Sequence, residues 1–217
     1  NSVRDPVLRE KLRPDYRATC KRLILSAGFY EAIQRENAEL VTEGIECIEK
    51  DGVRTADGRL HPLDVLVVAT GFRVSDFVRP MQVTGRAGIA LDDVWRAGPT
   101  AHLAISVPEF PNFFLLQGPS SPVGNFSLIE VAELQMGYIL QLIEQVCAGN
   151  AREIAPTRDA ARRYEEARRK AAKSTIWASG CRSWYIGQDG LPIAWPFPFD
   201  RFREEMESPR LEDYELR

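Results

Sequence analysis

The sequence lacks a long apolar segment and a marked excess of one charge. Its longest uninterrupted apolar run is only Val65 to Ala69, whereas a membrane-spanning helix needs roughly 18–20 apolar residues. The net charge of −3 over 217 residues gives no reason to expect nucleic acid or an anionic membrane as a partner. These absences favour a globular protein with a cytoplasmic location.

The sequence also lacks clustered cysteines. Its four cysteines form no C-x-x-C pair and are widely separated: Cys20, Cys47, Cys147 and Cys181. A zinc site is therefore not indicated, and we expect reduced thiols in an intracellular chain. The two histidines, His61 and His102, have no metal-ligand neighbour at helical or loop spacing, so no metal site is expected.

What is present is ordinary for a globular protein. Hydrophobic residues make up 44% of the chain and charged residues 27%, which is enough apolar material for a sizeable core. Near the N-terminus, Phe29, Tyr30 and Ile33 form an apolar face that predicts a short helix within residues 26–35. Asp51-Gly52 and Asp57-Gly58 are two-residue hairpin signals, so residues 38–60 predict a small antiparallel meander.

Two buried strands are expected next. Residues 64–69 are almost continuously apolar rather than alternating, which is typical of a strand covered on both faces of a parallel sheet. This strand ends at Thr70-Gly71, where the glycine permits close approach of a ligand. Residues 112–117 (NFFLLQ) predict a second such strand, which closes on Gly118-Pro119.

Two long helices are expected in the second half. Ser127 and Glu130 have the spacing of an N-terminal capping box, and Gly149 suits the C-terminal cap of the same helix. Thr157 begins a charged helix that runs to about residue 175, in which acidic residues interrupt the basic ones. This mixture favours a solvated face over a nucleic-acid surface. The tail then concentrates aromatic residues that we expect to pack in a core or an interface: Trp177, Trp184, Tyr185, Trp195, Phe197, Phe199 and Phe202.

Four segments, in this order, resemble the class B flavoprotein monooxygenases, particularly the Baeyer–Villiger subgroup. They are Cys20-Lys21-Arg22, residues 64–72 (DVLVVATGF), residues 95–121 (WRAGPTAHLAISVPEFPNFFLLQGPSS) and Ser183-Trp184-Tyr185. The resemblance implies an α/β fold. The fold would be that of the C-terminal part of a flavoprotein that has two Rossmann-like dinucleotide-binding domains, one for FAD and one for NADPH. This part would contain a small antiparallel meander and long helices. The resemblance implies three regions. Residues 1–63 would end the NADPH-binding domain, residues 64–150 would form the C-terminal half of the FAD-binding domain, and residues 151–217 would form a helical and aromatic tail that closes on the site.

The resemblance also implies an activity. The implied enzyme is an FAD- and NADPH-dependent monooxygenase that inserts one oxygen of O2 into an organic substrate through a C4a-(hydro)peroxyflavin. The implied reaction is a Baeyer–Villiger oxidation of a ketone. Arg22 matches the family's active-site arginine, since a permanently charged and forked donor suits anionic intermediates. Lys21 resembles a neighbour that contacts NADP. Without the resemblance, a Lys-Arg pair is ordinary surface charge.

Further cofactor contacts are implied by the same comparison. Trp184 matches a tryptophan whose indole N–H contacts the nicotinamide cofactor, although a packed tryptophan is the alternative. Gly118, Pro119 and Ser120 resemble the loop along the edge of the flavin ring system. Thr70 and Gly71 would approach the flavin or its diphosphate.

The sequence departs from the family pattern in one major respect. It contains no G-x-G-x-x-G, the motif that places cofactor pyrophosphates at helix N-termini,. We therefore expect a piece of a longer enzyme, which lacks the N-terminal region and binds FAD weakly or not at all by itself.

Smaller departures keep other functions open. Ser120-Ser121-Pro122 and Asn125 differ from the common Baeyer–Villiger pattern, so N- or S-oxygenation of a soft nucleophile is an alternative. A second alternative is a non-catalytic half-domain that pairs with another chain. A flavin disulfide reductase is not indicated, because the sequence has no C-x-x-C,.

Overall fold

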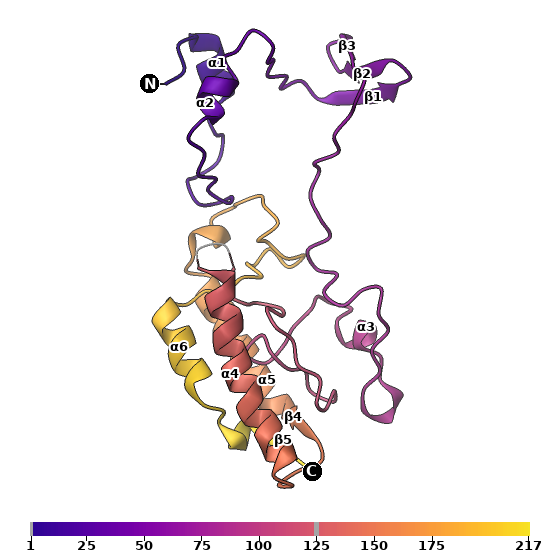
Figure 1. Ribbon diagram of the computed structural model, residues 1–217, viewed down its shortest axis with the longest axis vertical. Coiled ribbons are helices and arrows are strands. Elements are labelled where there is room, and N and C mark those ends of the chain that lie inside the picture. Colours follow the sequence, from indigo (N-terminus) through magenta and orange to yellow (C-terminus); the bar gives the residue numbers. More distant parts are fainter. Residues whose placement is uncertain (1, 124–125) are drawn as a thin grey trace. The chain divides into compact units, whose positions relative to one another are not determined.

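The computed structural model describes residues 2–123 and 126–217 (Figure 1). Asn125, one of the departures noted above, lies outside the described residues. The chain divides into two compact units. The described residues of unit 1 are 2–17 and 23–72, and those of unit 2 are 18–22, 73–123 and 126–217. The short segment 18–22 therefore belongs to unit 2, while the chain on both sides of it belongs to unit 1.

Unit 1 contains two short helices and a three-stranded sheet. Helix α1 (Pro6–Lys11) begins after Asp5, whose carboxylate accepts hydrogen bonds from the first turn, as an N-cap does. Helix α2 (Phe29–Ala32) lies inside the predicted helical segment. Strands β1 (Ile45–Glu49), β2 (Gly52–Thr55) and β3 (Leu60–Pro62) pair antiparallel in that order. The predicted meander is therefore confirmed.

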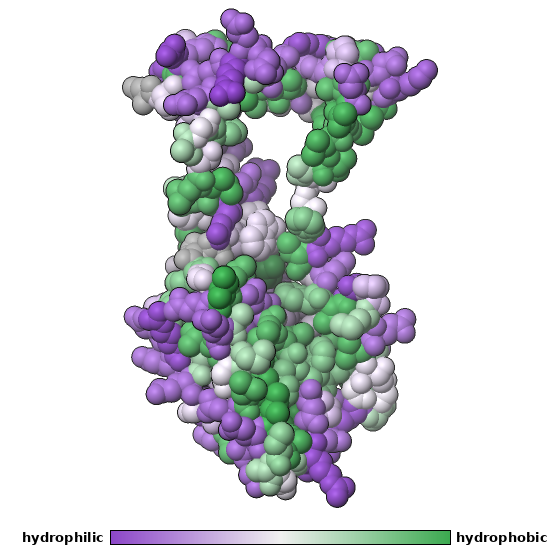
Figure 2. All heavy atoms as spheres, viewed as in Figure 1, coloured by the Kyte–Doolittle hydropathy of each residue, from purple (hydrophilic) through white to green (hydrophobic). Residues whose placement is uncertain are grey.

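The predicted buried strand at residues 64–69 is wrong for this chain. The segment is irregular, and Val65 and Val67 are 75% and 80% exposed. Figure 2 shows hydrophobic side chains on the surface where Figure 1 draws this segment. A strand buried on both faces needs neighbouring strands and covering helices. No described residue of the chain pairs with this segment as a strand.

Most of the regular secondary structure of unit 2 is helical. It contains η1 (Arg86–Gly88), α3 (Leu91–Val94), α4 (Leu128–Cys147), α5 (Arg158–Ala172), η2 (Ile176–Ala178), α6 (Phe199–Glu207) and η3 (Leu211–Asp213). Strands β4 (Ile154–Pro156) and β5 (Tyr214–Leu216) pair antiparallel. The predicted second strand, at residues 112–117, is also wrong. The described residues give it a single bridge, between Ser106 and Phe114, because no strand runs alongside it.

Both long helices begin where the sequence predicts. The Ser127 hydroxyl accepts a hydrogen bond from the Glu130 N–H, and the Thr157 hydroxyl accepts one from Ala160 at 3.0 Å. Gly149 follows α4 with a φ of 76°, a left-handed conformation that glycine adopts without strain. Capping depends on neighbours within one turn, so the local sequence contains the information.

The main core of unit 2 lies between α4, α6 and the β4–β5 ribbon. Tyr138 and Leu142 of α4 are buried there with Phe202 of α6, Trp195 and Tyr214. The expectation that most tail aromatics pack inside is confirmed for Trp195 and Phe202, whereas Trp184 remains half exposed. Among the described helices, none combines the length and apolar character that crossing a bilayer requires.

Candidate functional site

The loop that follows the segment 112–117 is a buried part of unit 2. Gly118, Pro119 and Ser120 are all buried, and Ser120 has a φ of 71°. A Cβ at position 118 would lie 2.5 Å from the carbonyl oxygen of Ala104, so no larger residue fits without displacement of the backbone. The backbone of Ala104 therefore lies directly against this loop at Gly118.

Gln135 of α4 anchors the same loop. Its Oε1 accepts a hydrogen bond from the Gln117 N–H at 2.7 Å, and its Nε2 donates to the Ser121 hydroxyl at 3.1 Å. Gln135 is fully buried. Sequence reasoning missed this residue, although a polar side chain on the buried face between Val131 and Tyr138 was a usable signal. Buried polar groups are nearly always hydrogen-bonded.

A disulfide joins the segment of Lys21 and Arg22 to the segment of Trp184. Cys20 is bonded to Cys181 across a sequence separation of 161 residues. The expectation of reduced thiols is wrong for this pair, because sequence spacing says nothing about which distant segments meet in the fold. The other two cysteines, Cys47 and Cys147, are free and exposed.

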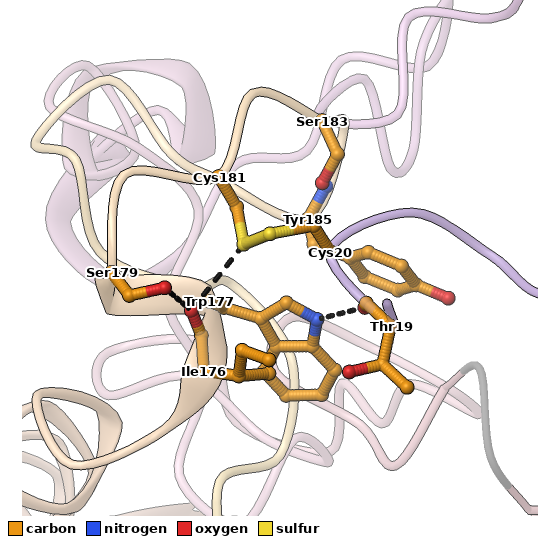
Figure 3. Close-up of a disulfide and its surroundings, with 8 residues drawn as sticks. All are labelled: Thr19, Cys20, Ile176, Trp177, Ser179, Cys181, Ser183 and Tyr185. Carbon is orange, nitrogen blue, oxygen red and sulfur yellow. Dashed lines mark hydrogen bonds between the residues drawn. A yellow bond between two sulfur atoms is a disulfide. The ribbon is translucent and has the colours of Figure 1, made fainter. Parts of the chain in front are cut away.

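The side chains of Trp177 and Tyr185 lie beside the disulfide (Figure 3). The Trp177 indole nitrogen donates a hydrogen bond to the main-chain oxygen of Thr19 at 3.2 Å. The Trp177 ring stacks on Tyr185 with centroids 5.2 Å apart, and Trp184 stacks on Tyr185 at 4.0 Å. The segment before Arg22 is therefore attached to the tail by a covalent bond and by the hydrogen bond from Trp177.

The structure distributes the candidate residues between the units. Lys21, Arg22, the loop Gly118–Ser120 and Trp184 belong to unit 2, whereas Thr70 and Gly71 belong to unit 1. Lys21, Arg22 and Trp184 are exposed, and so are Thr70 and Gly71. Within unit 2, the main-chain N–H of Trp195 donates a hydrogen bond to the main-chain carbonyl oxygen of Ser121 at 3.3 Å, which connects the loop to the tail.

Gly71 has a backbone that suits close approach of a ligand. Its φ is 99°, and a Cβ placed there would meet no heavy atom within 4 Å. The position therefore has a conformation that favours glycine and open space beside it.

The most perturbed histidine lies away from these candidate residues. His102 is 3% exposed and packs edge-on against Tyr164 and Tyr214. Burial lowers the pKa of His102 to about 4, and the positive charges of Arg210 and Arg163 act in the same direction while Asp213 opposes them. Neither ring nitrogen has a hydrogen-bond partner among the described residues. A neutral, enclosed imidazole of this kind is part of the core.

Comparisons with known proteins assign the chain to a family, although no protein-family signature matches it. It is 49% identical over 215 residues to an uncharacterized monooxygenase of Mycobacterium tuberculosis, covering 99% of the chain and 43% of that protein. It is 34% identical to an FAD-binding monooxygenase of Aspergillus niger (98% and 36% covered). It is 33% identical to a Baeyer–Villiger monooxygenase of Streptomyces coelicolor (99% and 42% covered).

The fold agrees with the sequence comparisons. A crystal structure of cyclohexanone monooxygenase from Rhodococcus, bound to NADP+, superposes with a TM-score of 0.86 at 30% identity, over 99% of the chain and 42% of that protein. The chain is a relative of the C-terminal portion of Baeyer–Villiger and other FAD-binding monooxygenases. It spans about two fifths of the length of these monooxygenases. The α/β architecture expected from the four segments is confirmed at this level.

Proposed function

We propose that the chain is the C-terminal part of an FAD- and NADPH-dependent monooxygenase that carries out a Baeyer–Villiger oxidation of a ketone with O2. One observation carries the proposal: the disulfide places the Arg22 segment beside the Trp184 segment in a single unit. Relatives whose names include Baeyer–Villiger monooxygenase and FAD-binding monooxygenase, and a neighbour bound to NADP+, support it.

The residues present fit the edges of such cofactors. Gly71 offers an open backbone for the flavin or its diphosphate, together with Thr70. The buried loop Gly118–Ser120 would run along the flavin ring system, where main-chain groups tune its electronics. Pyrophosphate binding would rest on the N-terminal region of the same enzyme, because the chain has no G-x-G-x-x-G.

The same reasoning extends to the regions of the chain. We assign residues 1–63 to the end of the NADPH-binding domain and residues 64–150 to the C-terminal half of the FAD-binding domain. Residues 151–217 would form the tail that closes on the site. The exposed apolar run from Val65 to Val68 supports this arrangement, because it has the composition of a strand that would be buried in a larger sheet.

The chain's own residues would act through charge and hydrogen bonding. Bound flavin would supply the activation of O2, with NADPH as the source of reducing equivalents. Arg22 is exposed and forms no ion pair among the described residues, so its guanidinium is available to stabilise negative charge on oxygen at the reacting centre. Lys21 and the Trp184 indole N–H would hold phosphate or ribose oxygens of NADPH.

Substitution of Arg22 in the full-length enzyme tests the proposal. We expect Arg22→Ala to lower kcat for a ketone by about 100-fold or more, the usual loss when a charge-stabilising donor is removed. Arg22→Lys should restore part of the rate. Arg17→Ala removes another exposed arginine five residues earlier and should leave kcat unchanged. An Arg22→Ala enzyme with unaltered ketone oxidation would refute the role of this residue.

The alternatives give different results in the same preparation. Stoichiometric flavin with ester or lactone products supports Baeyer–Villiger oxidation, whereas products only from sulfides or amines would establish N- or S-oxygenation. A colourless full-length protein that copurifies with a second chain carrying G-x-G-x-x-G would establish the non-catalytic half-domain. Stoichiometric flavin on the 217-residue chain alone would contradict the expectation that it binds FAD weakly by itself.

A further inference from the structure

The disulfide lies between the two segments that carry the proposed cofactor and substrate contacts. Cys20 directly precedes Lys21 and Arg22, and Cys181 lies three residues before Trp184. One covalent bond therefore limits how far the proposed catalytic arginine and the proposed NADPH contact can separate. No other disulfide occurs among the described residues, and the other two cysteines are exposed and free.

The segment 18–22 belongs to unit 2 and is bonded to the tail there. The chain before it and after it, at residues 2–17 and 23–72, belongs to unit 1. Neither a helix nor a strand includes residues 18–22. The connections that attach it to the tail include the disulfide and the hydrogen bond from Trp177 to Thr19.

The backbone next to the disulfide is held in an unfavourable conformation. Thr19 has a φ of 70°, and a β-branched residue in the left-handed region is strained. Such a conformation persists only where the surroundings enforce it. Loss of the covalent bond would therefore let Thr19, and with it Lys21 and Arg22, relax away from the tail.

The disulfide is buried, but the tail segment that contains Cys181 has little regular secondary structure. Cys20 is 3% and Cys181 8% exposed, so bulk solvent reaches neither sulfur freely. From residue 174 to residue 198, the only regular structure among the described residues is the single turn η2 and a bridge between Ile186 and Pro192. Segments of this kind open locally at low cost. The cations next to both cysteines (Lys21, Arg22 and Arg182) would attract an incoming thiolate.

We propose that the Cys20–Cys181 disulfide is a redox-controlled clamp that positions Arg22 against the Trp184 segment, and that thiol–disulfide exchange releases it. This inference rests on the proposed function for its effect on catalysis. The thiolate of a low-molecular-weight thiol attacks one sulfur, the Cys20–Cys181 bond breaks, and a mixed disulfide forms. A second small thiolate then attacks the small-thiol sulfur of the mixed disulfide, which releases the remaining protein thiolate. Two small thiols are oxidised to one small disulfide, and the cystine is reduced to two protein thiols. A low-molecular-weight disulfide reverses the exchange.

Cys20 and Cys181 are thus positioning residues, and their redox state should change binding and cleavage as well as rate. In the full-length enzyme, reduction with dithiothreitol should raise the KM for NADPH and lower kcat, and reoxidation with glutathione disulfide should restore both. Reduction should also speed trypsin cleavage after Lys21 and Arg22 by about 10-fold, because local opening governs proteolysis. Hydrogen exchange of residues 18–22 and 176–186 should rise in parallel.

Matched variants separate the clamp from general effects of reductant. The double variant Cys20→Ser/Cys181→Ser should resemble the reduced enzyme under both conditions. The double variant Cys47→Ser/Cys147→Ser, which removes the two free thiols, should keep the full response. Since reduction and reoxidation are first compared in the unaltered protein, the test does not depend on the folding of a variant.

The outcomes separate this inference from the proposed function. Redox-insensitive cleavage after Lys21 and Arg22 would overturn the clamp, and so would peptide mapping that finds the two cysteines unlinked in protein purified without reductant. Cleavage that switches in a protein that oxidises no NADPH would support the clamp and refute the proposed function. Activity that persists unchanged, together with unchanged cleavage, would leave the function standing without the clamp.

Discussion

The buried imidazole of His102 should make the stability of unit 2 depend on pH. Its pKa is about 4 in the folded protein because burial disfavours the charged ring, against about 6.5 in an unfolded chain. As the pH falls below 6.5, the unfolded state binds a proton that the folded state does not bind until about pH 4. The stability that neutral His102 contributes is therefore fully present above pH 6.5, and it is lost as the pH falls from about 6.5 to about 4.

The size of the effect follows from the difference between the two pKa values. The free energy of unfolding should fall by about 2 kcal/mol between pH 7 and pH 5, and by about 3 kcal/mol at pH 4. His102→Phe removes the titrating group and keeps an aromatic ring between Tyr164 and Tyr214. The variant should lose this part of the pH dependence.

Urea unfolding measured by tryptophan fluorescence gives the required readout. All four tryptophans belong to unit 2, so the signal reports the unit that contains His102. His61→Gln is the matched control, because His61 lies on β3 in unit 1. If the original chain and His102→Phe lose stability in parallel between pH 7 and pH 5, the assignment of the acid sensitivity to His102 is refuted.

Further predictions concern the disulfide, the buried loop and helix α4. Reduction of the disulfide should lower the free energy of unfolding by up to about 5 kcal/mol, the chain-entropy value for its sequence separation; equal urea midpoints with and without reductant would contradict this. Gly118→Ala should destabilise unit 2 by about 1–3 kcal/mol, because the new methyl group meets the Ala104 carbonyl. Gly137→Ala, on the open side of α4, should instead stabilise it by about 1 kcal/mol. Gln135→Leu should cost about 1–3 kcal/mol, because it leaves the Gln117 N–H and the Ser121 hydroxyl without their partner, and an unchanged melting temperature would show that this anchor is dispensable.

The sequence predicted the parts of the fold that depend on near neighbours. Ser127, Thr157 and Gly149 lie where capping residues were expected, since a cap is decided within one helical turn. The meander was found for the same reason, although Gly52 begins β2 and pairs with Glu49 instead of lying in the turn. The loop residues and Arg22 were chosen by resemblance, and their proposed contacts with cofactors stay predictions.

The errors all concern contacts between distant segments. Residues 64–69 have the composition of a buried strand, but burial requires neighbours that no described part of this chain supplies. Cys20 and Cys181 meet only because the fold brings together residues 161 positions apart. Gln135 was overlooked because its partners, Gln117 and Ser121, belong to a loop whose path the helical pattern does not reveal.

The exposed run from Val65 to Val68 bears on how the isolated chain behaves at high concentration. It is uncharged, rich in β-branched residues and free of proline, which is the composition of segments that stack into intermolecular β-sheets. Its irregular backbone leaves N–H and C=O groups open to pairing. Self-association through this stretch, rather than the stability of either unit, would then set the concentration at which the chain stays in solution.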